Sequence, residues 1–381
     1  MKSIRDIYKI GKGPSSSHTM GPERAAKLFK EKFPDAQNYR VYLYGSLSKT
    51  GVGHGTDRVI REVLSPKETE IIFSEEIIPD SHPNTMDMIA LADGREVGQL
   101  RVESIGGGDI RLPGDAAAVT SADIYNENSM TDIMAYCKDK GITRLSDYVE
   151  AHEGPEIWNF LSDVWETMKN AIAEGIRSEG ILPGGLNVQK RAKKLFELQP
   201  PEETPQLWEC RILSAYAFAV SEQNADNGTV VTAPTCGACG VLPAVLKYAQ
   251  VTRNFTDEEI CRGLATAGII GNLTKRNASI SGAECGCQAE IGSAAAMASA
   301  AAVEMMGGTP EQCLDAASIT ISNMLGLVCD PIAGLVEMPC QSRNAAGESS
   351  EYRPSARPEP SAAGDGFMNI PEGIDEELPF N

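Results

Sequence analysis

Ten cysteines are the residues of this sequence best suited to metal chemistry. Cys285 and Cys287 stand in SGAECGCQAE, Cys329 in LGLVCDPIAGL and Cys340 in VEMPCQSRN. Glycine, proline or aspartate flanks Cys287, Cys329 and Cys340, so a helix would end there and the backbone could bend around a metal centre. No C-x-x-C pair links these three, and buried structural thiols remain the alternative interpretation.

A C-x-x-C motif does occur elsewhere, at Cys236 and Cys239 in TAPTCGACGVL. A redox pair or a zinc half-site would need a thioredoxin-like setting or a second cysteine pair, and the sequence offers neither. We therefore interpret both residues as thiols at the start of a helix.

A run of hydroxyl residues with one histidine lies near the N-terminus. Ser15, Ser16, Ser17, His18 and Thr19 follow one another in a Gly/Ser-rich loop before an amphipathic stretch. Hydroxyls and backbone N–H groups at a helix N-terminus can bind a carboxylate or a phosphate. Capping of the helix by a single hydroxyl is the alternative.

His54 is a second histidine in a glycine-rich setting, GSLSKTGVGHGTDR (45–58), which we interpret as a loop after a strand. Thr56 and Asp57 are close enough in sequence to orient its ring. A histidine is a plausible base near neutral pH. A solvated loop histidine without a function is the alternative.

Two further stretches could contact a ligand. SIGGGDIRLPG (104–114) could cradle a phosphate, although a glycine run of this kind is also typical of a turn or linker. NASISGAE (277–284) offers an amide at Asn277 and hydroxyls at Ser279 and Ser281, just before the Cys285–Cys287 pair.

These candidates require a mixed α/β part followed by a helical part. A helix is predicted after Pro22, strands over 39–45 and 70–78, and two strands within 86–107 joined at Asp93–Gly94. From about residue 131 the apolar residues have helical spacing, with no convincing strand, and the small residues of 292–308 predict a buried helix. Residues 345–381 lack periodicity, which predicts disorder.

Composition restricts the class of protein. The chain has 381 residues, enough for two or three domains, and no apolar run of 18 residues that would span a membrane. Its 34 Lys+Arg against 53 Asp+Glu give a net charge of −19, which disfavours nucleic acid and anionic membranes as partners. No secretory signal is recognisable in MKSIRDIYKIGKG, so we expect a cytoplasmic protein with reduced thiols.

Five long strings together resemble motifs of the iron–sulfur L-serine dehydratases (L-serine ammonia-lyases), in the single-chain form with a β domain followed by an α domain. They occur in the expected order between about residues 3 and 346: GPSSSHTMGP, YGSLSKTGVGHGTD, TAPTCGACGVLPAVL, KRNASISGAECGCQAEIG and GLVCDPIAGLVEMPCQSRNA.

The resemblance implies an α+β fold with an N-terminal α/β sandwich-like domain (1–125), a mostly all-α iron–sulfur domain (126–346) and an atypical, disordered tail (347–381). It implies that Cys287, Cys329 and Cys340 hold a [4Fe–4S] cluster with one iron open to substrate. The other seven cysteines would then be plain thiols, and these are Cys137, Cys210, Cys236, Cys239, Cys261, Cys285 and Cys313.

The implied reaction is the β-elimination that converts L-serine to pyruvate and ammonia, in amino-acid catabolism and gluconeogenesis. The resemblance implies that His54 and Thr56 reach the active site, and we expect Ser15 to Thr19 with Asn277, Ser279 and Ser281 to contact substrate. It also suggests a homodimer. The residue that removes the Cα proton and the tolerance for threonine are left open.

The C-terminal segment departs from the family pattern. The family continues with further helices to a cysteine-bearing tail that can cap the open iron, whereas residues 348–381 do not resemble that tail and Cys340 is the last cysteine. We therefore expect the fourth iron position to lack its protein cap. An inactive relative that only binds serine or a similar carboxylate is the alternative function. A pyridoxal-phosphate dehydratase is disfavoured, because Lys275 is the only lysine near a candidate site and the second half is helical.

Overall fold

A mixed sheet organises the first third of the chain in the computed structural model, which describes residues 1–78, 81–112, 123–328, 330, 332 and 335–347. The strands are β2 (Asn38–Leu43), β3 (Thr69–Phe73), β4 (Thr85–Ala92), β5 (Arg95–Gly106) and β6 (Asp109–Arg111). Their order is β3-β2-β4-β5-β6, in which β2 and β3 are parallel and the other neighbours antiparallel. Asp93 and Gly94 both have positive φ in the β4–β5 turn, as the sequence predicts.

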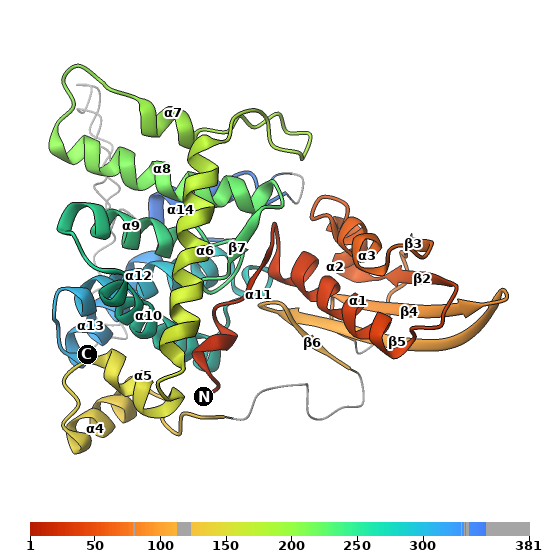
Figure 1. Ribbon diagram of the computed structural model, residues 1–381, viewed down its shortest axis with the longest axis horizontal. Coiled ribbons are helices and arrows are strands. Elements are labelled where there is room, and N and C mark those ends of the chain that lie inside the picture. The colour runs from red at the N-terminus through yellow and green to blue at the C-terminus, as the bar shows by residue number, and fades with distance from the viewer. Residues whose placement is uncertain (79–80, 113–122, 329, 331, 333–334, 348–381) are drawn as a thin grey trace, which may run out of the picture. The chain divides into compact units, whose positions relative to one another are not determined.

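Two helices cover one face of this sheet (Figure 1). They are α1 (Gly21–Lys32) and α3 (Thr56–Leu64), and the short helix α2 (Gly45–Thr50) precedes α3 between the parallel strands β2 and β3. Phe29 of α1 and Ile60 of α3 are fully buried against Val41 and Met88 of the sheet. Alternation along β2 thus supplies one apolar face, and helical spacing in α1 and α3 supplies the cover.

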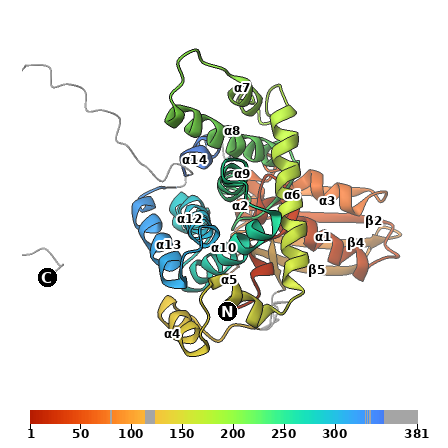
Figure 2. The same cartoon turned by 60° about the vertical axis from the view of Figure 1, so that its left-hand side comes forward.

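Helices dominate the rest of the chain (Figure 2). They are α4 (Met130–Lys140), α5 (Leu145–Glu153), α6 (Ile157–Arg177), α7 (Ala192–Glu197), α8 (Pro205–Ala225), α9 (Val241–Arg253), α10 (Asp257–Asn277), α11 (Gly282–Cys285), α12 (Ser293–Met305), α13 (Pro310–Met324) and α14 (Cys340–Gly347). Short π- or 3-10-helical turns are η1 (Ile4–Asp6), η2 (Ser16–Met20) and η3 (Gln288–Gly292). An α+β fold is therefore confirmed.

The helical core is built around α10 and α12. A capping box between Thr256 and Glu259 starts α10, and small residues let α12 pack closely beside it. Almost every residue of α12 is buried, as its composition predicts. Gly175 of α6 allows a similarly close approach to α8, because a Cβ there would lie 2.2 Å from the carbonyl oxygen of Ala219.

The first residues of the chain pack with the helices rather than with the sheet. Ile4, Ile7 and Tyr8 are buried in the helical core, and the Tyr8 hydroxyl donates to the carbonyl of Leu264 at 2.7 Å. Strand β1 (Ile10–Lys12) then pairs antiparallel with β7 (Thr229–Val231). The expectation of no strand in the second half was therefore wrong, because β7 is too short to show a period and forms only with a distant partner.

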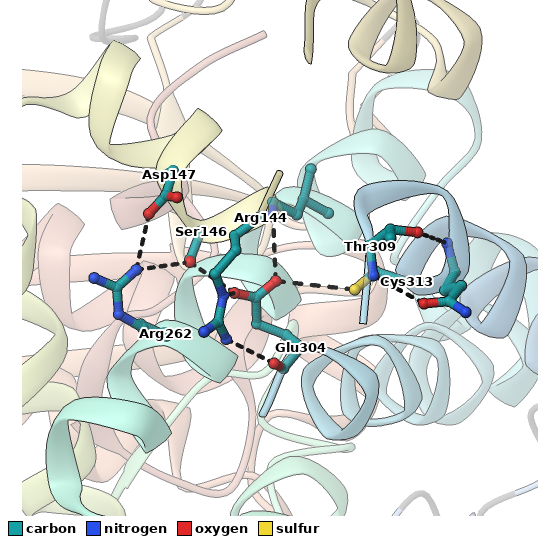
Figure 3. A network of polar contacts seen from close by, with 9 residues as sticks. Arg144, Ser146, Asp147, Arg262, Glu304, Thr309 and Cys313 are labelled. Atoms are coloured by element: carbon teal, nitrogen blue, oxygen red, sulfur yellow. Dashed lines mark hydrogen bonds and ion pairs between the residues drawn. The ribbon is translucent and has the colours of Figure 1, made fainter. Parts of the chain in front are cut away.

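A buried carboxylate joins three helices (Figure 3). Glu304, at the end of α12, is 0% exposed and accepts from Arg144 Nε at 2.8 Å and from the Ser146 hydroxyl at 2.7 Å, both at the start of α5. The thiol of Cys313 in α13 lies 3.9 Å from the same carboxylate. The network satisfies a charge that would otherwise be costly to bury, so it fixes α5 and α13 on α12.

Other local expectations were also wrong. Residues 45–58, expected as a loop, form α2 and the start of α3, because glycines allow two short helices to adjoin in a tight turn. The glycine run 106–108 is the turn between β5 and β6 rather than a domain linker, and β3 ends at Phe73. Residues 345–347 belong to α14, so they are not disordered, and residues 348–381 lie outside the described ones.

The helices of the described residues include none that is both long and apolar enough to cross a membrane. The division at residue 125 into two domains, with a tail from residue 347, stays a prediction.

Candidate active site

A cavity of about 430 Å³ is lined by segments of both the sheet part and the helical part. The sheet part contributes η2, α2 and the β5–β6 turn, and the helical part contributes the end of α10, the segment after it and the start of α14. The polar lining residues are Ser15, Ser16, Ser17, His18, Ser46, Thr50, His54, Asp109, Thr235, Lys275, Ser279, Ser281, Glu290 and Cys340. Candidates that are far apart in sequence thus share one cavity.

The serine run forms the π-helical turn η2 at the cavity wall. Ser15 is its N-cap, and the Ser15 hydroxyl accepts from the backbone N–H of His18 at 3.1 Å. The Ser17 hydroxyl lies 3.0 Å from Nδ1 of the same histidine. Capping therefore accounts for Ser15, while Ser16 and Ser17 exceed what a cap needs and also line the cavity.

His18 is held from both sides of its ring. Nε2 lies 2.9 Å from the hydroxyl of Ser46 in α2, opposite the Ser17 contact at Nδ1. Burial, and then the nearby charge of His54, lower the pKa of His18 to about 3. The His18 imidazole is therefore neutral near pH 7. It can donate one hydrogen bond to a hydroxyl and accept another, but it has no positive charge that would attract a carboxylate.

His54 lies between α2 and α3 with its ring against that of His18, at 4.7 Å between centroids and tilted by 32°. Its Nδ1 is 2.8 Å from the carbonyl oxygen of Thr50 in α2. A carbonyl oxygen only accepts, so we assign the proton to Nδ1 and a lone pair to Nε2. Burial lowers the pKa of His54 below its ordinary value, which keeps this lone pair available near neutral pH.

Thr19 and Thr56 do not line the cavity but support the residues that do. The Thr19 hydroxyl donates to the carbonyl of His54 at 2.9 Å. The Thr56 hydroxyl, which is fully buried, donates to the carbonyl of His18 at 2.6 Å. The two threonines thus lock the backbones of the two histidines to each other across η2 and the start of α3.

The segment after α10 also contains both residues that line the cavity and a residue that does not. Ser279 and Ser281 line the cavity, and the Ser279 hydroxyl accepts from the backbone N–H of Ser281 at 3.0 Å. Asn277 points elsewhere, because its amide donates to the carbonyl of Asn128 at 2.8 Å. Its described contacts are therefore structural.

The cysteines predicted as ligands lie beside this cavity as far as the structure describes them. Cys340 lines it, and Cys287 is buried within electrostatic range of the lining residues Glu290 and Cys340. Burial, then the negative charges of Glu290 and Cys287, raise the pKa of Cys340 to about 12. The Cys287 and Cys340 thiols therefore lie within electrostatic range of each other. Cys329 lies outside the described residues, and those residues contain no group of three His, Cys, Asp or Glu side chains that could hold a metal ion.

Arg343 connects the chain around all three cysteine positions. Its Nη1 contacts Sγ of Cys287 at 3.1 Å and donates to the carbonyl of Val328 at 2.8 Å and to the carboxylate of Asp330 at 2.6 Å. Val328 also packs against Gly286, where a Cβ would lie 3.0 Å from the Cα of Val328. The two residues that flank Cys329 in sequence are therefore bonded to a side chain that touches Cys287.

The remaining described cysteines lie elsewhere. Cys236 and Cys239 are buried just before α9, and Cys236 contacts the sulfur of Met20 at 3.8 Å. Burial raises the pKa of both thiols, which disfavours thiolate chemistry there. Cys137, Cys261 and Cys313 are buried, and Cys210 and Cys285 are exposed.

Sequence reasoning missed several residues of the cavity wall. Ser46 and Thr50 were hidden because α2 was expected to be a loop. Glu290, in the same motif as Cys287, accepts from the Thr235 hydroxyl at 2.6 Å, and burial raises its pKa to about 7. Two glycines in the quoted motifs were the available signal for a side chain packed at this place. A Cβ at Gly237 or Gly282 would lie 2.9 Å or 2.3 Å from the Glu290 carboxylate.

Comparison with known proteins identifies the family of this chain. Residues 70–354 match the serine dehydratase alpha chain family, and residues 3–65 match the serine dehydratase beta chain family. The chain is 37% identical to L-serine dehydratase 2 of Escherichia coli, over 91% of this chain and 87% of that protein. It is 38% identical to L-serine dehydratase of Haemophilus influenzae (91% and 88%) and 37% identical to L-serine dehydratase of Streptomyces coelicolor (90% and 87%). This chain therefore belongs to the L-serine dehydratase family.

Proposed function

We propose that this protein deaminates L-serine to pyruvate and ammonia by β-elimination, in the cavity lined by His18, His54 and Cys340. The position and the protonation of His54 are the main support for this proposal. His54 lines a cavity that Cys340 also lines, and its Nδ1–H directed at the Thr50 carbonyl leaves a lone pair on Nε2. The names and the extensive similarity of the relatives support L-serine as substrate.

In this proposal a [4Fe–4S] cluster is held by Cys287, Cys329 and Cys340. The donor set fits, because thiolates are the usual ligands of such clusters and the described segments next to all three cysteines meet at Arg343. When bound, the cluster supplies a Lewis acid for the β-hydroxyl, which is otherwise a poor leaving group.

The protein's own residues then perform the proton chemistry. His54 Nε2 accepts the Cα proton, the electrons of that C–H bond form the Cα–Cβ double bond, and the Cβ–O bond breaks with hydroxide leaving. The leaving hydroxide takes up the proton that His54 accepted and departs as water, which returns His54 to its neutral form. The released aminoacrylate tautomerises to an imine, and water hydrolyses the imine to pyruvate and ammonia.

Residues behind and in the cavity wall position the reactants. Thr19 and Thr56, which do not line the cavity, hold the histidine backbones, and we assign them no contact with substrate. Ser16, Ser17, Ser279 and Ser281 offer hydroxyls to the polar groups of serine, and this role follows from their place in the wall.

A homodimer and a cytoplasmic location stay predictions. The mass of the particle in solution tests the homodimer.

Anaerobic reconstitution with iron and sulfide tests the ligand set directly. The Cys287→Ala and Cys340→Ala variants should lose bound iron, visible absorption and pyruvate formation together. Cys239→Ala is the matched control, since Cys239 is also buried and close to the cavity wall yet should keep its iron. Full iron content in Cys287→Ala, or its loss in Cys239→Ala, would overturn the assignment.

A further inference from the structure

Asp109, at the start of β6, is shared by three cationic side chains from three different segments. Lys9 and Arg24 both contact its Oδ1, the latter at 3.2 Å, and Lys275 donates to its Oδ2 at 3.2 Å. One carboxylate can balance only one of these three positive charges. A surplus of positive charge therefore collects at this point of the fold.

The surplus is partly desolvated, which strengthens its effect. Burial lowers the pKa of Lys9; Asp109 opposes this shift and Lys275 adds to it. Asp6 is the other acidic group that acts on Lys9, and its influence is the weakest of these. Burial would raise the pKa of Asp109, but Lys9 and Lys275 hold it below its ordinary value, so the carboxylate stays ionised.

Lys275 is the member of this cationic group that lines the cavity. It lies in the last turn of α10 and is the one lysine or arginine among the described residues that line the cavity, whereas Lys9 and Arg24 lie outside the lining. Its ammonium group also lies close to the bare backbone of the β5–β6 turn, because a Cβ on Gly107 would be 4.0 Å from Nζ. Gly106, Gly107 and Gly108 all have positive φ, so this turn requires glycine and keeps side chains away from the ammonium group.

Asp109 also lines the cavity, but its negative charge is balanced by Lys9 and Arg24 as well as by Lys275, and the remaining ionisable groups of the wall do not compete for an anion. His18 and His54 are neutral near pH 7, because burial lowers both pKa values. Glu290 is a carboxylate in a different segment of the wall, within electrostatic range of Cys287, and would repel an anion. The cavity therefore has one position that favours a carboxylate and another that favours an ammonium group.

We propose that Lys275 binds the α-carboxylate of the amino-acid substrate, and that Asp109 is the positioning residue that holds the Lys275 ammonium group at the cavity wall, while Lys9 holds Asp109. This inference rests on the proposed function, because the carboxylate is taken to be that of L-serine. It assigns Lys275 a binding role through a charge-assisted hydrogen bond. The serine hydroxyls of η2 then contact substrate without carrying its charge.

Replacement of the charge tests this role. Lys275→Met should raise KM for L-serine about ten- to hundredfold while kcat changes much less, and Lys275→Arg should recover most of the loss. Arg276→Met is the matched control, because Arg276 is exposed in the same turn of α10 and should leave KM unchanged.

L-Serinamide separates carboxylate binding from a general structural effect. Its neutral amide does not need the cation, so its inhibition constant should be the same for the parent protein and Lys275→Met. An unchanged KM in Lys275→Met, or an equal loss of affinity for serinamide and L-serine, would overturn the inference. If the parent protein forms no pyruvate, the proposed function fails. The rise in Tm on adding L-serine then decides the carboxylate site, since the inference predicts that Lys275→Met abolishes this rise.

Discussion

His54→Gln removes the proposed base with little change in shape. The glutamine amide can still donate to the carbonyl of Thr50, which accepts from Nδ1 of the histidine at 2.8 Å, but its oxygen cannot take up a proton near neutral pH. A positioned general base contributes about 10²- to 10⁴-fold to rate, or about 3–5 kcal/mol of barrier. We therefore expect kcat for L-serine to fall by this factor, with KM within about threefold of the parent value.

The pH profile gives an independent readout of the same residue. His54 must be neutral to accept a proton, so activity is lost as pH falls through its pKa. Burial places that pKa below the ordinary 6.5, so kcat/KM should stay level from neutral pH to below 6.5 and decline only at lower pH. His54→Gln should lack this acid limb. The control is His82→Gln, because His82 does not line the cavity and its Nδ1 accepts from the backbone of Asn84.

Two results would contradict the assignment of His54 as the base. A kcat in His54→Gln within about threefold of the parent enzyme would show that another group removes the Cα proton. An acid limb that persists unchanged in the variant would show that the limb belongs to a different residue.

Four other substitutions test separate parts of the structure. Arg343→Met should weaken iron binding about 10- to 100-fold, since it removes a contact to a proposed ligand, and an unchanged iron content after anaerobic desalting would contradict this. Glu304→Ala should lower the free energy of unfolding by about 3 kcal/mol, measured by urea denaturation, because the half-exposed Arg144 loses a buried partner. In His18→Gln, stability should depend less on pH between 5 and 6.5. The unfolded state takes up a proton in this window and the folded histidine does not, so the parent protein loses up to about 1.4 kcal/mol per pH unit as pH falls, and equal slopes would refute the assignment. Gly175→Ala should cost about 1–3 kcal/mol by forcing α6 from α8, and an unchanged Tm would show that the helices can separate at no cost.

Much of the fold could be predicted because its signals are local. Pro22 placed the start of α1, Asp93–Gly94 placed the β4–β5 turn, and the small residues of α12 indicated a buried helix. Elements that depend on distant partners were missed. Strands β1 and β7 have three residues each and exist only because they pair across more than 200 positions of sequence.

The candidate site was predictable where chemistry follows from residue type. Cysteines, histidines and serine hydroxyls were identified from the sequence, and the structure brings His18, His54 and Cys340 to one cavity. The orientation of each side chain was not predictable. Thr56 lies in the same motif as His54, but its hydroxyl turns to the His18 backbone because α3 begins at that residue. Lys275 gains its significance only from Asp109, which lies 166 residues away.

The fate of L-serine on the protein reconstituted anaerobically with iron and sulfide decides whether the protein is a serine-deaminating lyase. We expect pyruvate and ammonia in equal amounts over many turnovers, and neither product from the protein without iron. Reconstituted protein whose Tm rises with L-serine but which forms no pyruvate would refute the proposed lyase activity and would identify a serine-binding relative instead.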